Sequence, residues 1–379
     1  MSSLTRVDVG TSFGNLGRWR SLDPVLLFST LALCLFGIFA VYVAGTDDRQ
    51  AYAADQAFGF VFGVMIAVPL ALIDYRVWKQ KVWLLYALAI LMLLAVLFGG
   101  TTINGSTSWI VVGPVQFQPS EFAKMLMILV MAGFFADRNI AENSTLLRSI
   151  GVLCVPWALV FLQPDLGTAL VFAAFFITMV FIGGARPMQL LALAAVGISG
   201  VVAVLKLGVL EPYQMDRLMA FIDQENSGDI GYQVAQSKVA VGSGGLTGKG
   251  IDATTLANLG FLPEDHTDFI FANLGERTGF AGCALLLVLF LILIWRILHI
   301  ASISRDRFGV LISVGIAAIF LFHVLVNVGM TLGIMPVTGI PLPFVSYGRS
   351  SLVTSLLCLG LLQSIAMRSR QEMSTQPRI

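Results

Sequence analysis

Hydrophobic residues are grouped along the chain in long runs that short polar segments separate. A helix that crosses a membrane needs about 20 mostly apolar residues. We find ten such runs, at approximately Pro24–Ala44, Phe58–Ile73, Val82–Phe98, Ser120–Phe135, Ile150–Phe161, Gly167–Ile182, Leu190–Leu207, Asp268–Trp295, Phe308–Gly333 and Pro343–Met367. The run at 150–161 is short, so its helix either extends into its flanks or is irregular. No alternating ten-residue pattern recurs, which excludes a β-barrel. The pattern predicts an all-α polytopic membrane protein with about ten transmembrane helices.

Composition supports this class. Of the 379 residues, 57% are hydrophobic and only 12% are charged, whereas roughly a quarter are charged in an average soluble domain. The net charge is +1 and no basic block occurs, so we expect no nucleic-acid partner. The four cysteines lie dispersed in apolar runs, and three scattered histidines argue against a zinc site.

Lysine and arginine positions predict the orientation, because cytoplasmic loops are enriched in these residues. In a ten-span arrangement, 15 of the 23 basic residues fall on one side, namely Arg6, Arg18, Arg20, Arg76, Lys79, Lys81, Arg138, Arg148, Arg186, Arg296, Arg305, Arg307, Arg368, Arg370 and Arg378. Both termini (residues 1–22 and 368–379) are therefore expected in the cytoplasm, within a single membrane domain spanning 1–379. The other eight basic residues are Arg49, Lys124, Lys206, Arg217, Lys238, Lys249, Arg277 and Arg349, and fall in outer loops or at outer ends of spans. A long extracytoplasmic loop, about 208–267, separates spans 7 and 8.

Two proline-containing segments introduce acids at the start of a span. Pro119 and Glu121 make a favourable helix start, with the acid facing the helix dipole. Lys124 lies one turn further on the same face, and a structural ion pair and a substrate contact are equally compatible with it. Asp165 repeats the pattern, and there helix capping is the stronger interpretation. Trp109, just upstream, fits either an interfacial aromatic residue or a site residue.

The long loop contains the glycine-rich segment 242–250. A phosphate-binding P-loop is excluded because the spacing is wrong, no Ser or Thr follows Lys249, and the loop lies on the side without ATP. A flexible hinge and a nest of backbone donors for a phosphate both remain open.

The segment 261–271 places three acids and a histidine directly before a long apolar run. Thr267 or Asp268 could cap that helix, but capping needs one residue and not four titratable groups. A carboxylate between water and the aromatic rings of Phe269 and Phe271 is well placed to act as a base. Further on, prolines break the segment 336–351, and such backbone at membrane depth lines a cavity or is buried in protein. The cation of Arg349 in that segment indicates a nearby anion.

These segments, in this order, resemble the SEDS (shape, elongation, division and sporulation) family of peptidoglycan glycosyltransferases. The resemblance is carried by residues 118–124, 163–168, 244–250, 266–272 and 336–348. Residues 232–238, 248–250 and 261–264 look like the rod-shape-determining elongation branch of that family. The resemblance implies ten spans and polymerisation of lipid II on the outer face of the cytoplasmic membrane. It also implies a class B penicillin-binding protein and the elongation machinery as partners.

The resemblance assigns catalysis to Asp268 and cavity roles to Trp109, Glu121 and Lys124. We extend the candidate substrate-binding set to Asp165, Lys238, Lys249, Glu276, Ser346 and Arg349. The chain departs from the family pattern at Ser108, where arginine is usual, at Arg277, where an acid is usual, and at Arg349, where glycine is usual. Our hypothesis is that the two added cations replace the lost arginine in binding pyrophosphate.

The resemblance also implies a mechanism. The lipid II sugar is α-linked and the polymer is β-1,4-linked, so the reaction inverts the anomeric centre in one displacement. Such a reaction needs a base, for which we propose Asp268, and positive charge for the departing pyrophosphate. Candidates for that charge are Lys124, Lys238, Arg349 or a divalent cation (Mg²⁺ or Mn²⁺), although no spacing identifies a metal site.

A lipid II flippase or another lipid-linked transporter is the alternative function. Ten spans, broken helices and intramembrane charges suit a transporter. Against it, no inverted repeat is evident, and the polar groups cluster at one face of the membrane. A scaffold whose long loop docks a partner is the third alternative, and it would not require Asp268 or Lys124.

Overall fold

The computed structural model describes residues 21–44, 49–103, 106–113, 115–208, 210–224, 228–250, 264 and 266–374. Within these residues, nine helices are long and apolar enough to cross a membrane. They are α1 (Pro24–Ala44), α2 (Arg49–Leu72), α4 (Val82–Gly99), α5 (Pro119–Ala136), α6 (Asn143–Leu162), α8 (Pro187–Leu207), α11 (Ile270–Ile303), α12 (Arg307–Thr331) and α13 (Arg349–Ser374). The apolar helix α7 (Leu166–Ile182) is slightly shorter. Each of the ten predicted runs therefore falls on a helix.

Several boundaries differ from the prediction. The short run at 150–161 is the second half of α6, which begins in the polar residues from Asn143 onward. Helix α11 begins at Ile270, so Asp268 lies in the preceding turn and outside the helix. The last span begins at Arg349 and not at Pro343, because residues 343–348 still belong to the broken segment.

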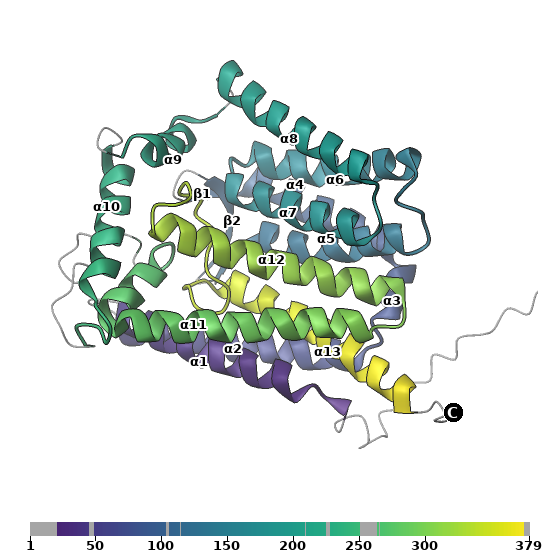
Figure 1. Ribbon diagram of the computed structural model, residues 1–379, viewed down its shortest axis with the longest axis horizontal. Coiled ribbons are helices and arrows are strands. Elements are labelled where there is room, and N and C mark those ends of the chain that lie inside the picture. The colour runs from purple at the N-terminus through teal and green to yellow at the C-terminus, as the bar shows by residue number, and fades with distance from the viewer. Residues whose placement is uncertain are drawn as a thin grey trace, which may run out of the picture.

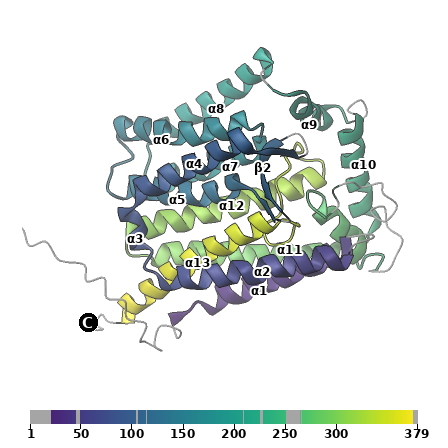
Figure 2. The same ribbon diagram turned by 180° about the vertical axis from the view of Figure 1, so that it is seen from behind.

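The helices form a bundle with α5, α12 and α13 at its centre. Most residues of these three helices are buried, whereas α2, α4 and α6 are exposed over most of their surface. Helix α8 lies at the edge of the bundle (Figures 1 and 2), and only Gln189 of its residues is buried. An apolar helix without a buried face is suited to contact lipid.

The two connections at one end of the bundle are more ordered than the sequence predicted. Between α4 and α5 the chain forms an antiparallel sheet of β1 (Thr101–Ile103), β2 (Ser106–Val112) and β3 (Val115–Phe117), in the order β1-β2-β3. The long loop contains α9 (Pro212–Ile222) and α10 (Gly228–Ser243). Figure 1 shows β1, β2, α9 and α10 at the end of the bundle away from the start of α1.

The glycine-rich segment packs on a kink in α11. Gly279 has φ 67° and ψ −165°, which interrupts the helix. The amides of Lys249 and Gly250 donate to the carbonyls of Glu276 and Arg277, at 3.0 and 3.1 Å. The Gly248 amide donates to Gly244 O at 2.8 Å. These three donors are used within the fold and are not available to a phosphate, which argues against the nest of backbone donors that the sequence had left open.

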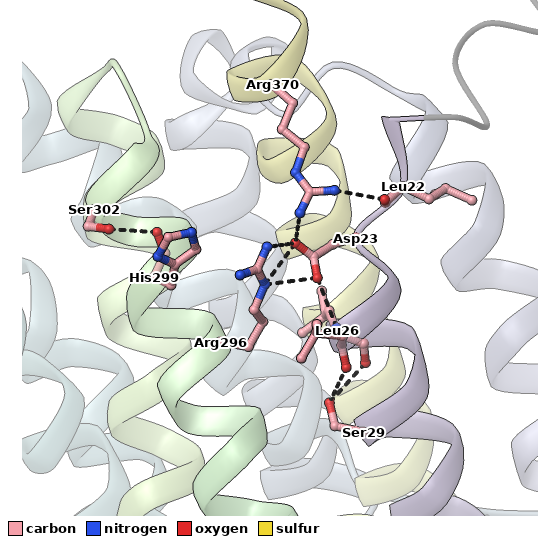
Figure 3. A network of polar contacts seen from close by, with 9 residues as sticks. Leu22, Asp23, Leu26, Ser29, Arg296, His299, Ser302 and Arg370 are labelled. Atoms are coloured by element: carbon pink, nitrogen blue, oxygen red, sulfur yellow. Dashed lines mark hydrogen bonds and ion pairs between the residues drawn. The ribbon is translucent and has the colours of Figure 1, made fainter. Parts of the chain in front are cut away.

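An ion-pair cluster holds the opposite end of the bundle together (Figure 3). Asp23, fully buried before α1, accepts hydrogen bonds from Arg296 Nε of α11 at 2.9 Å and from Arg370 Nη2 of α13 at 2.6 Å. The Leu26 amide donates to Asp23 Oδ1 at 3.0 Å. One carboxylate therefore joins three helices, two of which lead towards the candidate site described below. A short helix, α3 (Arg76–Gln80), connects α2 and α4 at this end.

Candidate active site

A cavity of about 530 Å³ opens where β2, α9, the turn before α11 and the broken segment before α13 meet. Six of the predicted site residues line it, namely Trp109, Glu121, Lys124, Asp165, Asp268 and Arg349. These residues come from segments spread over most of the chain. The fold therefore brings together side chains that the sequence could only name one at a time.

The turn carrying Asp268 is held by side chains from two neighbouring segments. Asn327 Nδ2 of α12 donates to Asp268 O at 3.0 Å and to Ile340 O at 2.9 Å. Ser346 Oγ donates to Thr267 O at 2.7 Å and accepts from the Leu342 amide at 2.9 Å. Ser346 does not line the cavity, and its geometry is that of a residue that positions the turn. Asn327 has the same role and was not among the predicted site residues.

Asp268 has the ionisation expected of a base that works near neutral pH. Its side chain is half-buried, and this burial raises the pKa of the carboxyl group to about 6. The positive charge of Arg217 lowers the pKa, and the negative charge of Glu264 raises it. Phe269, and not Asp268 or Thr267, is the residue that precedes α11, so the capping interpretation was wrong. The Asp268 carboxylate is therefore not used as a helix cap.

Lys124 lies in a buried chain of polar groups on the cavity wall. Its Nζ is 2.7 Å from Glu121 Oε1 and 3.3 Å from His323 Nε2. The ion pair, one of the two alternatives that the sequence left open, is therefore present, and Lys124 still lines the cavity. His323 Nδ1 lies 2.9 Å from Pro341 O. Since a carbonyl only accepts, Nδ1 carries the proton and Nε2 accepts from Lys124. His323 was missed because a single histidine in an apolar run carries no signal in the sequence.

Two further cavity residues have structural partners. Asp165 is the N-cap of α7, and its Oδ1 accepts from the Thr168 amide at 2.9 Å. This confirms the capping interpretation and leaves Asp165 on the cavity wall. Arg349 Nη2 is 2.6 Å from Asp55 Oδ2, so the anion beside this arginine is a residue of α2. Trp109 is half-buried on β2.

The structure does not bring four other predicted residues to the cavity. Lys238 on α10 donates to Gln224, and Lys249 Nζ is 2.7 Å from the buried Glu276 Oε1. Lys238, Lys249 and Glu276 are three of these residues, and the fourth is Ser346, described above.

Arg277 is buried in α11, where its Nε donates to Asn273 Oδ1 at 3.0 Å. The hypothesis that Arg277 binds pyrophosphate therefore finds no support, because this side chain is buried beside Asn273 and does not line the cavity.

Other cavity residues were not predicted. Arg217 and Tyr213 of α9 line the cavity, with the guanidinium 5.5 Å from the centre of the tyrosine ring. The rings of Tyr52, His266 and Tyr347 contact one another with centroid distances of 4.9 to 5.7 Å. Nothing in the spacing of the sequence linked α9 or the start of α2 to Asp268. Among the described residues, no group of three or more His, Cys, Asp or Glu side chains could hold a metal ion.

Comparison with known proteins gives a consistent result. Residues 24–371 match the FtsW/RodA/SpoVE family, described as "Cell cycle protein". Stage V sporulation protein E of Bacillus subtilis is 36% identical over 365 residues, covering 92% of this chain and 98% of that protein. The peptidoglycan glycosyltransferase MrdB of Escherichia coli K12 is 37% identical over 350 residues, covering 91% and 93%.

Solved structures agree with these sequence relationships. A chain from a peptidoglycan synthase complex described as coordinating polymerisation and crosslinking superposes with a TM-score of 0.80 and 30% identity, covering 93% of this chain and 100% of that one. The rod shape determining protein RodA of Thermus thermophilus gives a TM-score of 0.70 at 30% identity, covering 95% and 99%. These matches extend over nearly the whole bundle, including the segments that build the cavity. The chain is therefore a multi-pass membrane protein that belongs to the FtsW/RodA/SpoVE (SEDS) family.

Proposed function

We propose that this protein is a peptidoglycan glycosyltransferase that polymerises lipid II into β-1,4 glycan strands during cell elongation. Relatives that are 33 to 37% identical over most of the chain are named peptidoglycan glycosyltransferases. The observation that carries the proposal is Asp268, whose pKa is raised to about 6 and which shares one cavity with Lys124 and Arg349. A transferase of this type needs a base and cations in the same space.

The orientation follows from charge. Of the described residues, Arg76, Lys79 and Arg368 lie at the same end of the bundle as the Asp23 cluster. We place this end in the cytoplasm. The cavity then opens on the outer face, where lipid-linked sugars are polymerised.

In the proposed reaction, the acceptor's 4-hydroxyl oxygen attacks the anomeric carbon of the donor sugar. A new C–O bond forms, and the bond from that carbon to the diphosphate oxygen breaks and leaves its electron pair on the diphosphate. Asp268 accepts the hydroxyl proton, and the configuration inverts. The base needs to be ionised before the reaction, and a pKa near 6 leaves most of Asp268 ionised at pH 7.

Two neighbours in the cavity wall orient Lys124. Glu121 and His323 each accept from its ammonium group, which leaves one of the three N–H groups free to point into the cavity. A Mg²⁺ or Mn²⁺ ion in this reaction would be held mainly by the oxygens of the substrate's diphosphate, because the described residues offer no cluster of metal ligands.

We further propose a class B penicillin-binding protein as partner. The similar chain of the peptidoglycan synthase complex belongs to an assembly that coordinates polymerisation with crosslinking. A transpeptidase bound to this chain would crosslink strands as they leave the cavity. Co-purification of the two tagged proteins from detergent-solubilised membranes tests this part of the proposal.

The experiment is polymerisation of purified lipid II by the protein, alone and together with that partner, beside Asp268→Asn. This substitution keeps the shape of the side chain and removes the base. We expect long glycan strands from the wild type and a loss of turnover of about 10²- to 10⁴-fold in the variant. Asp137→Asn, an exposed acid at the opposite end of the bundle, is the matched control and is expected to retain activity. Wild-type activity in Asp268→Asn would remove Asp268 from the mechanism. No glycan product, with lipid II crossing liposome membranes instead, would identify a transporter.

A further inference from the structure

The cavity holds three lysine or arginine side chains from the described part of the chain, namely Lys124, Arg217 and Arg349. Two of them are neutralised by a neighbouring carboxylate. Lys124 pairs with Glu121 at 2.7 Å, and Arg349 pairs with Asp55 at 2.6 Å. Lys238, the other cation considered for the leaving group, lies outside the cavity and donates to Gln224. The cations expected from the sequence are thus already engaged with other residues of the chain.

Arg217 is different. It extends from α9, is half-buried, and forms no ion pair or hydrogen bond with any residue that the structure describes. Its guanidinium lies beside Gly339 of the broken segment, where a side-chain Cβ would come within 2.8 Å of Nη1. The Tyr213 ring, 5.5 Å away, supports its apolar face. Its charge acts on the nearby carboxyl group of Asp268, but no salt bridge to a described residue occupies its N–H donors. Those donors therefore remain available to an anion that enters the cavity.

The neighbouring elements keep Arg217 in this position. Helix α9 is fixed to the start of α7 by Tyr213 and Gln214, whose Nε2 donates to Pro164 O at 3.0 Å. Gln214 is buried, and its Oε1 accepts from the Glu211 amide at 3.1 Å. These hydrogen bonds fix the first turn of α9, so Arg217 lies on an ordered helix beside the cavity.

We propose that Arg217 binds the diphosphate of the lipid-linked sugar donor and stabilises the negative charge that this group gains on departure. The assignment rests on the proposed glycosyl transfer, which places a diphosphate in this cavity. When the bond between the anomeric carbon and the diphosphate oxygen breaks, its electron pair remains on that oxygen, and the planar guanidinium can donate two parallel hydrogen bonds to phosphate oxygens. The acceptor's proton meanwhile goes to Asp268. Arg217 is close enough to Asp268 to influence its ionisation, and both residues line the same cavity, so base and leaving-group site share one space.

A binding measurement tests this without requiring turnover. Farnesyl diphosphate, a short prenyl diphosphate, and farnesol, which lacks the phosphates, are titrated into the detergent-solubilised full-length protein. The variants are Arg217→Gln, Arg217→Lys and, as control, Lys206→Gln, which removes an exposed cation at the end of α8. We expect Arg217→Gln to weaken farnesyl diphosphate binding by roughly tenfold or more, with farnesol binding unchanged. Arg217→Lys should be intermediate, because lysine keeps the charge and loses the paired donors. Lys206→Gln should bind like the wild type.

The outcomes separate the two proposals. Equal affinity of Arg217→Gln and wild type for farnesyl diphosphate would overturn the assignment, even if the wild type polymerises lipid II. A changed pH midpoint of turnover with unchanged diphosphate affinity would overturn it as well, because Arg217 would then act only on Asp268. Reduced affinity in Arg217→Gln with an unchanged melting temperature supports it. Failure of the wild type to polymerise lipid II would count against the proposed function, and the binding result would stand separately.

Discussion

The Nε2 atom of His323 lies 3.3 Å from the Nζ atom of Lys124, in the wall of the cavity and between two membrane-spanning helices. His323 is held in turn by Pro341 O, 2.9 Å from Nδ1. The lysine is therefore fixed from α12 as well as by Glu121 from its own helix. The direction in which Lys124 points depends on a residue that is about two hundred positions away in the sequence.

Replacing His323 by phenylalanine should disrupt this arrangement. The ring would be similar in size but would offer Lys124 no acceptor, and a lost hydrogen bond to a charged group costs about 1.5–3 kcal/mol. We expect polymerisation to fall by at least about tenfold, while His323→Gln, which keeps an acceptor, retains more activity. His299→Phe, on the exposed surface of α11, is the control for changing a histidine. Full activity in His323→Phe would show that Lys124 needs no support from α12.

Turnover should depend on pH through Asp268. Because its pKa is raised to about 6, the base is ionised above that pH and takes up a proton below it. The polymerisation rate should therefore fall to half near pH 6 and decline about tenfold per unit at lower pH. A rate that stays constant down to pH 5 would contradict the role of Asp268 as base.

Replacing Glu264 should shift the pH dependence of the polymerisation rate in a defined direction. Its negative charge raises the pKa of Asp268, so Glu264→Gln should lower that pKa and move the midpoint to lower pH. The glutamine can still interact with Thr267 Oγ1, which is 2.6 Å from Glu264 Oε2. Rates measured from pH 4.5 to 8 for both proteins give the comparison, and a midpoint that moves upward would be inconsistent with this electrostatic account.

Asp23→Asn should destabilise the protein. Burial by itself raises the pKa of Asp23, but hydrogen bonds from Arg296 and Leu26 and the charge of Arg370 lower it overall, so the group is ionised at neutral pH. Removing one partner from a buried ion pair typically costs about 3–5 kcal/mol. We expect a clear loss of melting temperature in detergent. Asp137→Asn, which removes the exposed pair with Lys79, should change the melting temperature little.

Gly279→Ala should also destabilise the protein. The conformation at φ 67° and ψ −165° is essentially restricted to glycine, and a Cβ there would lie 2.3 Å from the Gly248 amide nitrogen. The backbone strain alone is about 1–3 kcal/mol, so we expect a lower melting temperature and lower expression. Gly242→Ala in α10, where no atom lies within 4 Å of the added Cβ, is the control. Equal stability of the two variants would mean that the kink in α11 does not require glycine at position 279.

The two connections at the cavity end show where prediction from sequence stopped. The strand β2 is short and begins with polar residues, among them Ser106 and Ser108 before Trp109. Its sequence therefore shows no alternation of polar and apolar residues that would have predicted a strand. The sequence predicts a long loop where α9 forms, because α9 is short and its apolar residues cover only one side of the helix. Both elements contribute to the cavity. Trp109 could be named from the sequence because the family resemblance covers it, whereas no motif singled out Arg217 in the long loop.

The sequence by itself determined the ten apolar helices, the asymmetry of basic residues, and the candidates Asp268, Glu121 and Lys124. These features depend on local composition and on near neighbours in the chain. Apolar runs of sufficient length enter the lipid, and acids at a helix start interact with its dipole, whatever the rest of the chain does. Tertiary structure decided which charges remain available. Arg349 is paired with Asp55 and Lys249 with Glu276. Arg217 forms no salt bridge with a described residue and acts on Asp268 only through its charge. Pairing depends on which distant side chains share a space, and only the packed bundle sets that.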